Sequence, residues 1–366
     1  MTPRPLFALL ALAILLAGCG HVIHSAPNYG NHPFDFEKPP DCKREGPPGG
    51  ETVDLRYLGA GGLAIGWRGE TILAAPFFSN YGFLRVGLGH QSPNEEAIRT
   101  GMENVPRTVS AIFAGHSHYD HLGDLPVVAG TYAPRARIYV NDSGVTLLKP
   151  LLGERVESLQ SSVDHWVRLR DASGRELPIR VLPLLTEHAP HIDHYLWGHG
   201  EAKSPRSPNW EGMRIAALKA GTPLAYVIDL LDERDQVRYR IYYQDAASGK
   251  GKGVPSQAVL AERPFDLAVL CMASYNRVDD APASLLREIK PRHVLAIHYE
   301  DFFRRKEHRR FVVLLTDKLA NAYLKKIEQT LTGPLQGPVG QVCGPSAEAW
   351  TMPLPGEEIH FRPGGS

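Results

Sequence analysis

The sequence concentrates metal-binding side chains within six consecutive residues. His116, His118, Asp120 and His121 stand there, directly after the apolar run Val109–Ala114 and a glycine. Histidine is the commonest metal ligand at neutral pH, and a carboxylate suits a borderline divalent ion as its companion. The stretch therefore predicts a metal site at the end of a buried strand, whereas the alternative is a set of solvated histidines on a polar loop.

The spacing of these residues favours two metal ions over one. In an extended segment, residues two apart point the same way, so His116 and His118 converge on one side. Asp120 and His121 fall where the chain turns into an expected helix over Leu122–Ala129. That turn directs them toward a second, adjacent point.

A histidine-x-histidine-x-aspartate-histidine motif after a hydrophobic strand resembles the signature of the metallo-β-lactamase fold superfamily. The resemblance implies an α/β fold, a four-layer αββα sandwich, in a single catalytic domain over residues 51–366. Strands expected at Thr52–Leu58, Leu63–Trp67 and Thr71–Ala75 would open it. Members usually carry an aspartate before the proline that ends this region, where it supports the metal site, but this chain has Ala75.

The resemblance also implies ligands farther along the chain. The family places a third histidine for the first metal just past a mid-chain strand, which here selects His188, after Ile179–Leu185. His191 and His194 are competitors, because the three histidines are evenly spaced. The last ligand of the family corresponds to His298, which follows the expected strand His293–Ile297.

A carboxylate that bridges both metals is expected from the family at the end of a buried strand. Asp245 fits this position, because it comes just after the expected strand Arg238–Tyr243. Asp229 and Asp232 are rivals at the end of the preceding strand. The residue before the bridging aspartate is usually glycine, and here it is Gln244.

The resemblance assigns one metal to three histidines and the second to a mixed set, with Asp245 between them. The first set is His116, His118 and His188; the second is Asp120, His121 and His298. Two Zn²⁺ ions per chain suit these nitrogen-rich ligands. The implied function is a dinuclear zinc-dependent hydrolase that uses a metal-bridging hydroxide on an ester, amide or phosphodiester. Asp120 and Asp245 are its expected catalytic carboxylates.

Two other function classes remain open. One is an iron-dependent oxidoreductase on the same fold. The other is a non-catalytic envelope lipoprotein that uses the fold as a binding module, which the departures at Ala75 and Gln244 favour. Metal analysis distinguishes the iron-dependent oxidoreductase from a zinc hydrolase. A folded protein with neither metal nor turnover would indicate the binding module.

The substrate class is suggested by local similarity. The segments 57–59, 76–79 and 297–299 are more similar to the branch that contains N-acyl phosphatidylethanolamine phospholipase D and related lactonases than to secreted β-lactamases. This similarity favours a lipid-like phosphodiester as the substrate. The aromatic segment Phe77–His90 either packs against the sheet or forms a flap over the metals. The long segment Ala189–Gly212 is a candidate wall of the substrate pocket.

The N-terminus predicts export and membrane attachment. The apolar run Leu6–Ala17 is too short for a membrane-spanning helix and has the length of a signal-peptide core. It precedes Cys19 in a pattern that resembles a bacterial lipoprotein signal, although an ordinary secretory signal is the alternative. We expect a signal peptide over residues 1–18, a Pro/Gly-rich tether over 19–50, and attachment through lipidated Cys19 in the bacterial cell envelope. Gly20 favours the periplasmic side of the outer membrane.

Composition limits the possible partners. Lys plus Arg equals Asp plus Glu, at 40 each, so no charge excess predicts nucleic-acid binding. We expect a small-molecule or lipid-like substrate and no nucleic acid. In an oxidising compartment Cys42 and Cys343 are candidates for a disulfide, while Cys271 lies in an apolar strand and is expected to be a buried thiol.

Overall fold

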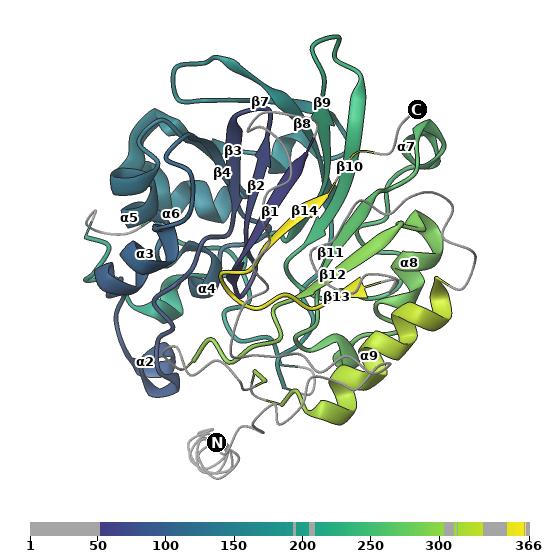
Figure 1. Cartoon of the computed structure of the whole chain (residues 1–366). Helices are drawn as coiled ribbons and strands as arrows, with labels where there is room; N and C mark the ends of the chain where they lie inside the picture. Colours follow the sequence, from purple (N-terminus) through teal and green to yellow (C-terminus); the bar gives the residue numbers. More distant parts are fainter. Residues whose placement is uncertain are drawn as a thin grey trace.

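The computed structural model describes residues 52–192, 195–204, 209–303, 311–312, 314–331, 350–361 and 363. The predicted signal peptide and tether, Cys19, Cys42, Cys343 and His194 lie outside these residues. In the described part, two mixed β-sheets lie next to each other, with helices on their outer sides (Figure 1). The predicted αββα arrangement is confirmed. No helix in this part combines the length and apolarity needed to cross a membrane.

The first sheet has the strand order β14-β1-β2-β3-β4-β5-β6. Its strands are β1 (Val53–Gly59), β2 (Gly62–Trp67), β3 (Glu70–Ala74), β4 (Val109–Phe113), β5 (Arg137–Val140), β6 (Val156–Ser158) and β14 (Glu358–Phe361). The predicted opening meander is confirmed as β1 to β3. From the far end of the sequence, β14 returns to pair antiparallel with β1.

The second sheet has the strand order β13-β12-β11-β10-β9-β8-β7. Its strands are β7 (Val167–Arg170), β8 (Glu176–Leu185), β9 (Leu224–Leu231), β10 (Val237–Gln244), β11 (Leu267–Cys271), β12 (His293–Ile297) and β13 (Trp350–Thr351). Because β9 is antiparallel to both β8 and β10, and β10 to β12 are mutually parallel, the carboxyl ends of β8, β10 and β12 share one edge. The loops after these strands therefore meet.

Burial explains why the central strands form. All residues of β4, β11 and β12 are buried, as expected of strands covered on both faces. By contrast, β1 alternates buried and half-buried residues in its first half. Cys271, in β11, is a buried free thiol as predicted.

Helices cover the outer face of each sheet. They are α2 (Phe83–Leu88), α3 (Glu95–Met102), α4 (Tyr119–Leu122), α5 (Leu125–Val127), α6 (Asp142–Leu152), α7 (Gln257–Glu262), α8 (Ala283–Ile289) and α9 (Asp317–Thr330). Figure 1 shows α3, α5 and α6 beside the first sheet and α8 and α9 beside the second.

Three helix predictions differ from the structure in their bounds. The helix expected from residue 122 begins at Tyr119 as α4 and continues, after a break, as α5. The amphipathic pattern of residues 311–329 predicts one helix, but α9 begins only at Asp317, because the Thr316 side chain caps it by accepting from Leu319 N–H. Within the aromatic segment 77–90, expected to be a loop, α2 forms.

Candidate metal centre

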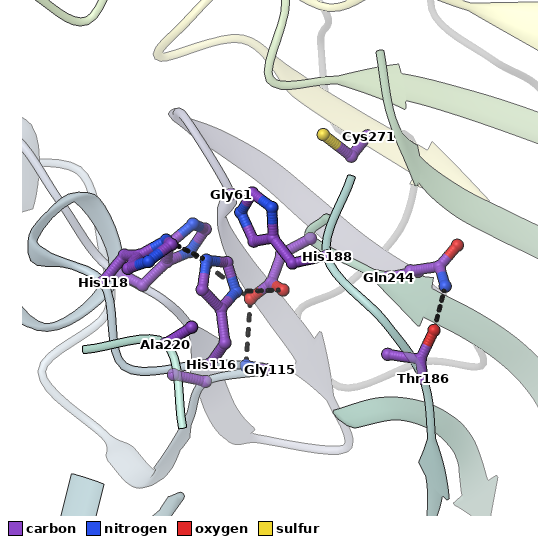
Figure 2. Close-up of polar contacts among 12 residues, drawn as sticks. Gly61, Gly115, His116, His118, Thr186, His188, Ala220, Gln244 and Cys271 are labelled. Carbon is purple, nitrogen blue, oxygen red and sulfur yellow. Dashed lines mark hydrogen bonds and ion pairs between the residues drawn. The ribbon is translucent and has the colours of Figure 1, made fainter. Parts of the chain in front are cut away.

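All seven predicted ligands come together where β4, β8, β10 and β12 end. The described residues contain three groups whose potential ligand atoms lie within 4.8 Å of one another. They are His116 with His118 and His188; Asp120 with His121 and His298; and His116 with His121 and Asp245. We call the first two groups the three-histidine cluster and the Asp120 cluster. Figure 2 shows His116, His118 and His188 converging.

The three-histidine cluster has the spacing that a tetrahedral ion requires. His116 Nε2 lies 3.1 Å from His118 Nδ1, and the His188 ring centroid lies 4.7 Å from that of His116. Two nitrogens bound to a tetrahedral zinc ion are about 3.3 Å apart. His188 Nδ1 lies 2.7 Å from the Ala189 carbonyl oxygen, to which it donates, so His188 Nε2 is left with a lone pair. This hydrogen bond from Nδ1 fixes the His188 tautomer in which Nε2 can bind a metal ion.

The Asp120 cluster is built from the start of α4 and the end of β12. Asp120 Oδ2 lies 3.5 Å from His121 Nε2 and 3.3 Å from His298 Nε2. His298 adopts the left-handed conformation, with φ of 59°. Its backbone N–H donates to the Tyr57 hydroxyl (2.9 Å), which in turn donates to Glu300 (2.5 Å). These contacts stabilise a backbone conformation that is unfavourable for a residue with a side chain.

Asp245 lies on the opposite side of His116 and His121 from the two clusters. Its Oδ1 is 3.0 Å from His116 Nδ1, and its Oδ2 is 3.3 Å from His121 Nδ1. Oδ2 also accepts the Gly115 backbone N–H at 2.9 Å. In this arrangement the carboxylate orients two imidazoles through the nitrogens that face away from the clusters. The expected bridging position between two ions stays a prediction.

Burial favours the neutral form of three of these imidazoles, whereas Asp120 raises the pKa of His298 against the effect of burial; the neighbouring imidazoles keep the carboxylates ionised. Desolvation, with the adjacent imidazoles, lowers the pKa of His118 and His188 well below the usual value and that of His121 to about 4. Although burial opposes ionisation of Asp245, His121 and His116 hold its pKa at about 2. Neutral histidine and ionised aspartate are the forms that bind metal.

The donor atoms fit a divalent ion. His121 Nε2 is buried without a hydrogen-bond partner among the described residues, as is His298 Nδ1. A buried polar atom without a partner costs about 1–3 kcal/mol, and ligation of His121 Nε2 would remove that cost there. Imidazole and carboxylate groups together suit zinc and also iron.

Close packing leaves room only for glycine at three positions around the site. A Cβ at Gly61 would lie 2.6 Å from the His121 ring, and one at Gly115 would lie 2.3 Å from Asp245 Oδ1. Gly198 has φ of +76°, and a Cβ there would lie 2.8 Å from His118 Nε2. Sequence reasoning missed all three roles.

Asp124 was also missed, because its role depends on the loop that it holds. The Asp124 carboxylate accepts the backbone N–H groups of Phe78 (2.6 Å) and Ser79 (2.8 Å). Burial raises the pKa of Asp124 to about 6, and these hydrogen bonds oppose the rise. The carboxylate thus fixes the aromatic segment next to α4.

Gln244, at the position where glycine is usual, makes two side-chain hydrogen bonds. Its side-chain amide donates to the Thr186 hydroxyl (2.8 Å) and to the Ser248 hydroxyl (2.7 Å). The Thr186 contact joins the end of β10 to the end of β8, two residues before His188 (Figure 2). The departure therefore supports the loop that carries a ligand. At Ala75 only a backbone contact is made, from its N–H to the Phe113 carbonyl oxygen (2.7 Å).

The rival aspartates have other partners. Asp229 is fully buried in an ion pair with Arg240 (Nε to Oδ1 2.7 Å), which joins β9 to β10. Asp232 accepts backbone N–H groups in the turn between the same strands. Neither belongs to a metal-binding group of the described residues.

The aromatic segment packs into the core at its start, and its role as a flap over the metals stays a prediction. Phe77 and Tyr81 are buried against Tyr119, with ring centroids 5.8 and 6.1 Å away. Farther along, Phe83 is 38% exposed and lies 5.5 Å from the Phe303 ring. Phe303 stacks on Phe302 at 4.7 Å, and Phe302 lies 4.9 Å from the His298 imidazole. A row of rings thus joins the surface to the Asp120 cluster.

The segment 189–212 lies beside the three-histidine cluster. Its described residues form no helix or strand of regular length. The Trp197 ring lies 6.1 Å from Tyr119 and 6.4 Å from His118. The segment thus packs beside the cluster, and its role as a wall of a substrate pocket stays a prediction.

Comparison with known proteins gives similarity of fold only. No family model matches this chain, and no curated protein matches it. Among solved structures, it is similar to the metallo hydrolase Igni18 of Ignicoccus hospitalis (14% identity, 85% of this chain and 98% of that one, TM-score 0.46). It is similar to the metallo-β-lactamase fold protein YhfI of Bacillus subtilis (12% identity, 85% of this chain and 99% of that one, TM-score 0.46). It is also similar to CmlA, a diiron β-hydroxylase of Streptomyces venezuelae (13% identity, 85% of this chain and 54% of that one, TM-score 0.47). The assignment of the centre therefore rests on its own residues.

Proposed function

We propose that this chain is a metal-dependent hydrolase with two zinc ions, one in each cluster. The observation that carries the proposal is the separation of the ligands into two buried groups. His116, His118 and His188 form one, and Asp120, His121 and His298 form the other. Structural histidines rarely gather in this way, because buried unpaired imidazole nitrogens are costly.

The chain's own residues would hold the ions and orient the substrate. Bound divalent ions acidify water and polarise the bond that is cut. Asp120, ionised and 3.3 Å from His298, is placed to orient the attacking water or to accept its proton. Asp245 accepts from His116 and faces His121, which keeps both imidazoles in the ligating orientation.

An amphipathic ester or phosphodiester is the proposed substrate. The row of Phe83, Phe303 and Phe302 ends at His298 and offers an apolar path for an acyl or alkyl portion. Leu84 and Leu88 of α2 add exposed apolar surface beside it, at 62% and 73% exposure. We also propose that Cys19 is lipidated and tethers the chain in the bacterial cell envelope, which the sequence around it supports.

Metal analysis and turnover together test this proposal. The purified chain should contain about two zinc ions and hydrolyse bis-p-nitrophenyl phosphate or a simple lactone. His118→Ala and Asp245→Ala should lose turnover, whereas His165→Ala, at an exposed histidine outside the clusters, should retain it. Two iron ions in place of zinc would move the assignment to an oxidoreductase. A folded chain without metal or turnover would leave a binding protein.

A further inference from the structure

We propose that His191 is a hydrogen-bond donor to the substrate, not a metal ligand: its neutral Nε2–H serves an oxygen that gains negative charge in the reaction. This inference rests on the proposed function, since it gives a role to a histidine beside the three-histidine cluster. His191 competes with His188 for the ligand position in the sequence, but it belongs to no metal-binding group of the described residues.

A backbone contact determines the tautomer of His191. The Trp197 backbone N–H lies 3.1 Å from His191 Nδ1 and can only donate. Nδ1 therefore accepts, and the single proton of the neutral imidazole is on Nε2. A ring whose Nδ1 accepts a hydrogen bond carries one proton only, so this contact also defines the neutral form.

The position of the ring places this donor next to the centre. Its centroid lies 4.9 Å from that of His188 and 5.7 Å from that of His118. Across the described part of the chain, no protein atom accepts a hydrogen bond from His191 Nε2. A half-buried N–H beside the candidate metal centre, with no acceptor among the described residues, is available to a ligand.

Backbone hydrogen bonds fix the segment that carries His191. Ala189 N–H donates to the Ala247 carbonyl oxygen at 2.7 Å, just after Asp245. On the far side of the segment, Ala220 N–H donates to the Gly198 carbonyl oxygen at 2.8 Å. His191 N–H donates to the Tyr195 carbonyl oxygen at 3.0 Å. The donor is thus held in place before substrate arrives, as electrostatic stabilisation requires.

The role requires no change of protonation. Hydrolysis of an ester or phosphodiester builds negative charge on a non-bridging oxygen, and Nε2–H donates to that oxygen while the proton stays on nitrogen. Removing one such donor typically lowers kcat by about 10²–10³-fold.

Two substitutions separate the donor from the packing of the ring. In His191→Asn the amide oxygen can still accept the Trp197 N–H, but no donor remains near the position of Nε2. In His191→Gln the longer amide can donate from that position. His199→Asn is the matched control, because His199 is exposed on the same segment and belongs to neither cluster.

The first measurement is binding of inorganic phosphate to the metal-loaded full chain by calorimetry, which needs no turnover. His191→Asn should keep the wild-type metal content and bind phosphate about 10- to 100-fold more weakly, the usual effect of losing a hydrogen bond to a charged group. His191→Gln should recover most of the affinity, and His199→Asn should match the wild type. On any substrate that the wild type hydrolyses, kcat of His191→Asn should fall while KM changes little.

Several results would overturn the inference. Loss of metal in His191→Asn makes His191 a ligand. Unchanged phosphate affinity in that variant, or no phosphate binding by the metal-loaded wild type, removes the donor role. An Nδ1–H tautomer in the ¹⁵N spectrum of the histidine-labelled chain contradicts the geometry. Failure of the proposed function is distinct, because a wild-type chain that binds no metal refutes it before any variant is made.

Discussion

The orientation of each imidazole in the three-histidine cluster depends on what its other ring nitrogen or its ring edge contacts. His116 faces Asp245 through Nδ1, and His188 donates from Nδ1 to the Ala189 carbonyl oxygen. Within the described part of the chain, His118 has no such partner at Nε2; instead, its ring edge packs against Gly198. The orientation of His118 is therefore set by close packing, which a single methyl group can disturb.

Gly198→Ala should weaken binding of the ion held by the three-histidine cluster. The new Cβ would lie 2.8 Å from His118 Nε2, so the imidazole must shift. We expect about 10- to 100-fold weaker zinc binding at one of two sites, the usual effect of disturbing a ligand's support. Competition with a chromogenic zinc chelator measures it.

Gly200→Ala is the matched control. Its φ is +96°, so it carries similar backbone strain, but no atom lies within 4 Å of its Cβ. Both variants should lose about 1 kcal/mol of stability from the left-handed conformation, and only Gly198→Ala should lose zinc affinity. Equal zinc affinities in the two variants would rule out the packing role.

At the scale of elements, the site depends on contacts that join the two sheets. Tyr57, in β1, binds the residues that follow β12, 243 positions away in sequence. Tyr226, in β9, donates to the Ala114 carbonyl oxygen at 2.8 Å and so joins the end of β4 to the second sheet. These hydrogen bonds set the distance between the two halves of the metal centre.

Tyr57→Phe should weaken the Asp120 cluster selectively. The change removes the acceptor for His298 N–H and the donor to Glu300, both of which are buried. Unfolding free energy should fall by about 1–3 kcal/mol, and zinc affinity should fall at one site. Urea unfolding and zinc titration measure the two effects.

Tyr242→Phe distinguishes the role of Tyr57 from a general loss of stability. The Tyr242 hydroxyl is also buried and donates to the Gly253 carbonyl oxygen at 2.8 Å, away from both clusters. This variant should lose similar stability and keep both zinc sites. If both tyrosine variants bind zinc like the wild type, Tyr57 does not position His298.

At the scale of the whole molecule, a cluster of neutral histidines makes the metal-free fold sensitive to acid. The pKa of His121 is lowered to about 4 in the folded chain, against 6.5 in the ordinary case. Between these values the unfolded chain binds a proton that the folded chain does not, so unfolding free energy falls as pH decreases from 6.5 to 4. A shift of this size corresponds to roughly 3 kcal/mol. The lowered pKa of His191 likewise makes the unfolding free energy fall as pH decreases.

Asp124 opposes this trend, because its pKa is raised to about 6. Its contribution to stability is full below its unfolded pKa of 3.8 and is lost as pH rises through 6. His298, whose pKa is also raised, acts in the same direction as Asp124. Since four histidines have lowered pKa values against these two groups, we expect net destabilisation of the metal-free chain from pH 6.5 to 4, measured by urea unfolding. Greater stability at pH 4.5 than at pH 6.5 would show that the histidines are not buried as described.

The family resemblance selects His188 and His298, each just past an expected strand, and the structure brings both beside the residues 116–121. Their strands, β8 and β12, run in the same direction, so their ends share one edge; the assignment as metal ligands stays a prediction. Gly198 and Glu300 could not be found, because their roles arise from contacts between segments far apart in the chain. The start of α9 at Asp317 was missed because its apolar periodicity extends past the Thr316 cap.

The central claim is that one chain holds two separate metal sites, and stoichiometry tests it most directly. Zinc titration of the metal-free chain, followed by calorimetry, should give two equivalents for the wild type. His188→Ala should lose the site of the three-histidine cluster and His298→Ala the site of the Asp120 cluster, each keeping one equivalent. A single equivalent in the wild type, lost in both variants, would contradict two independent sites and show one shared site.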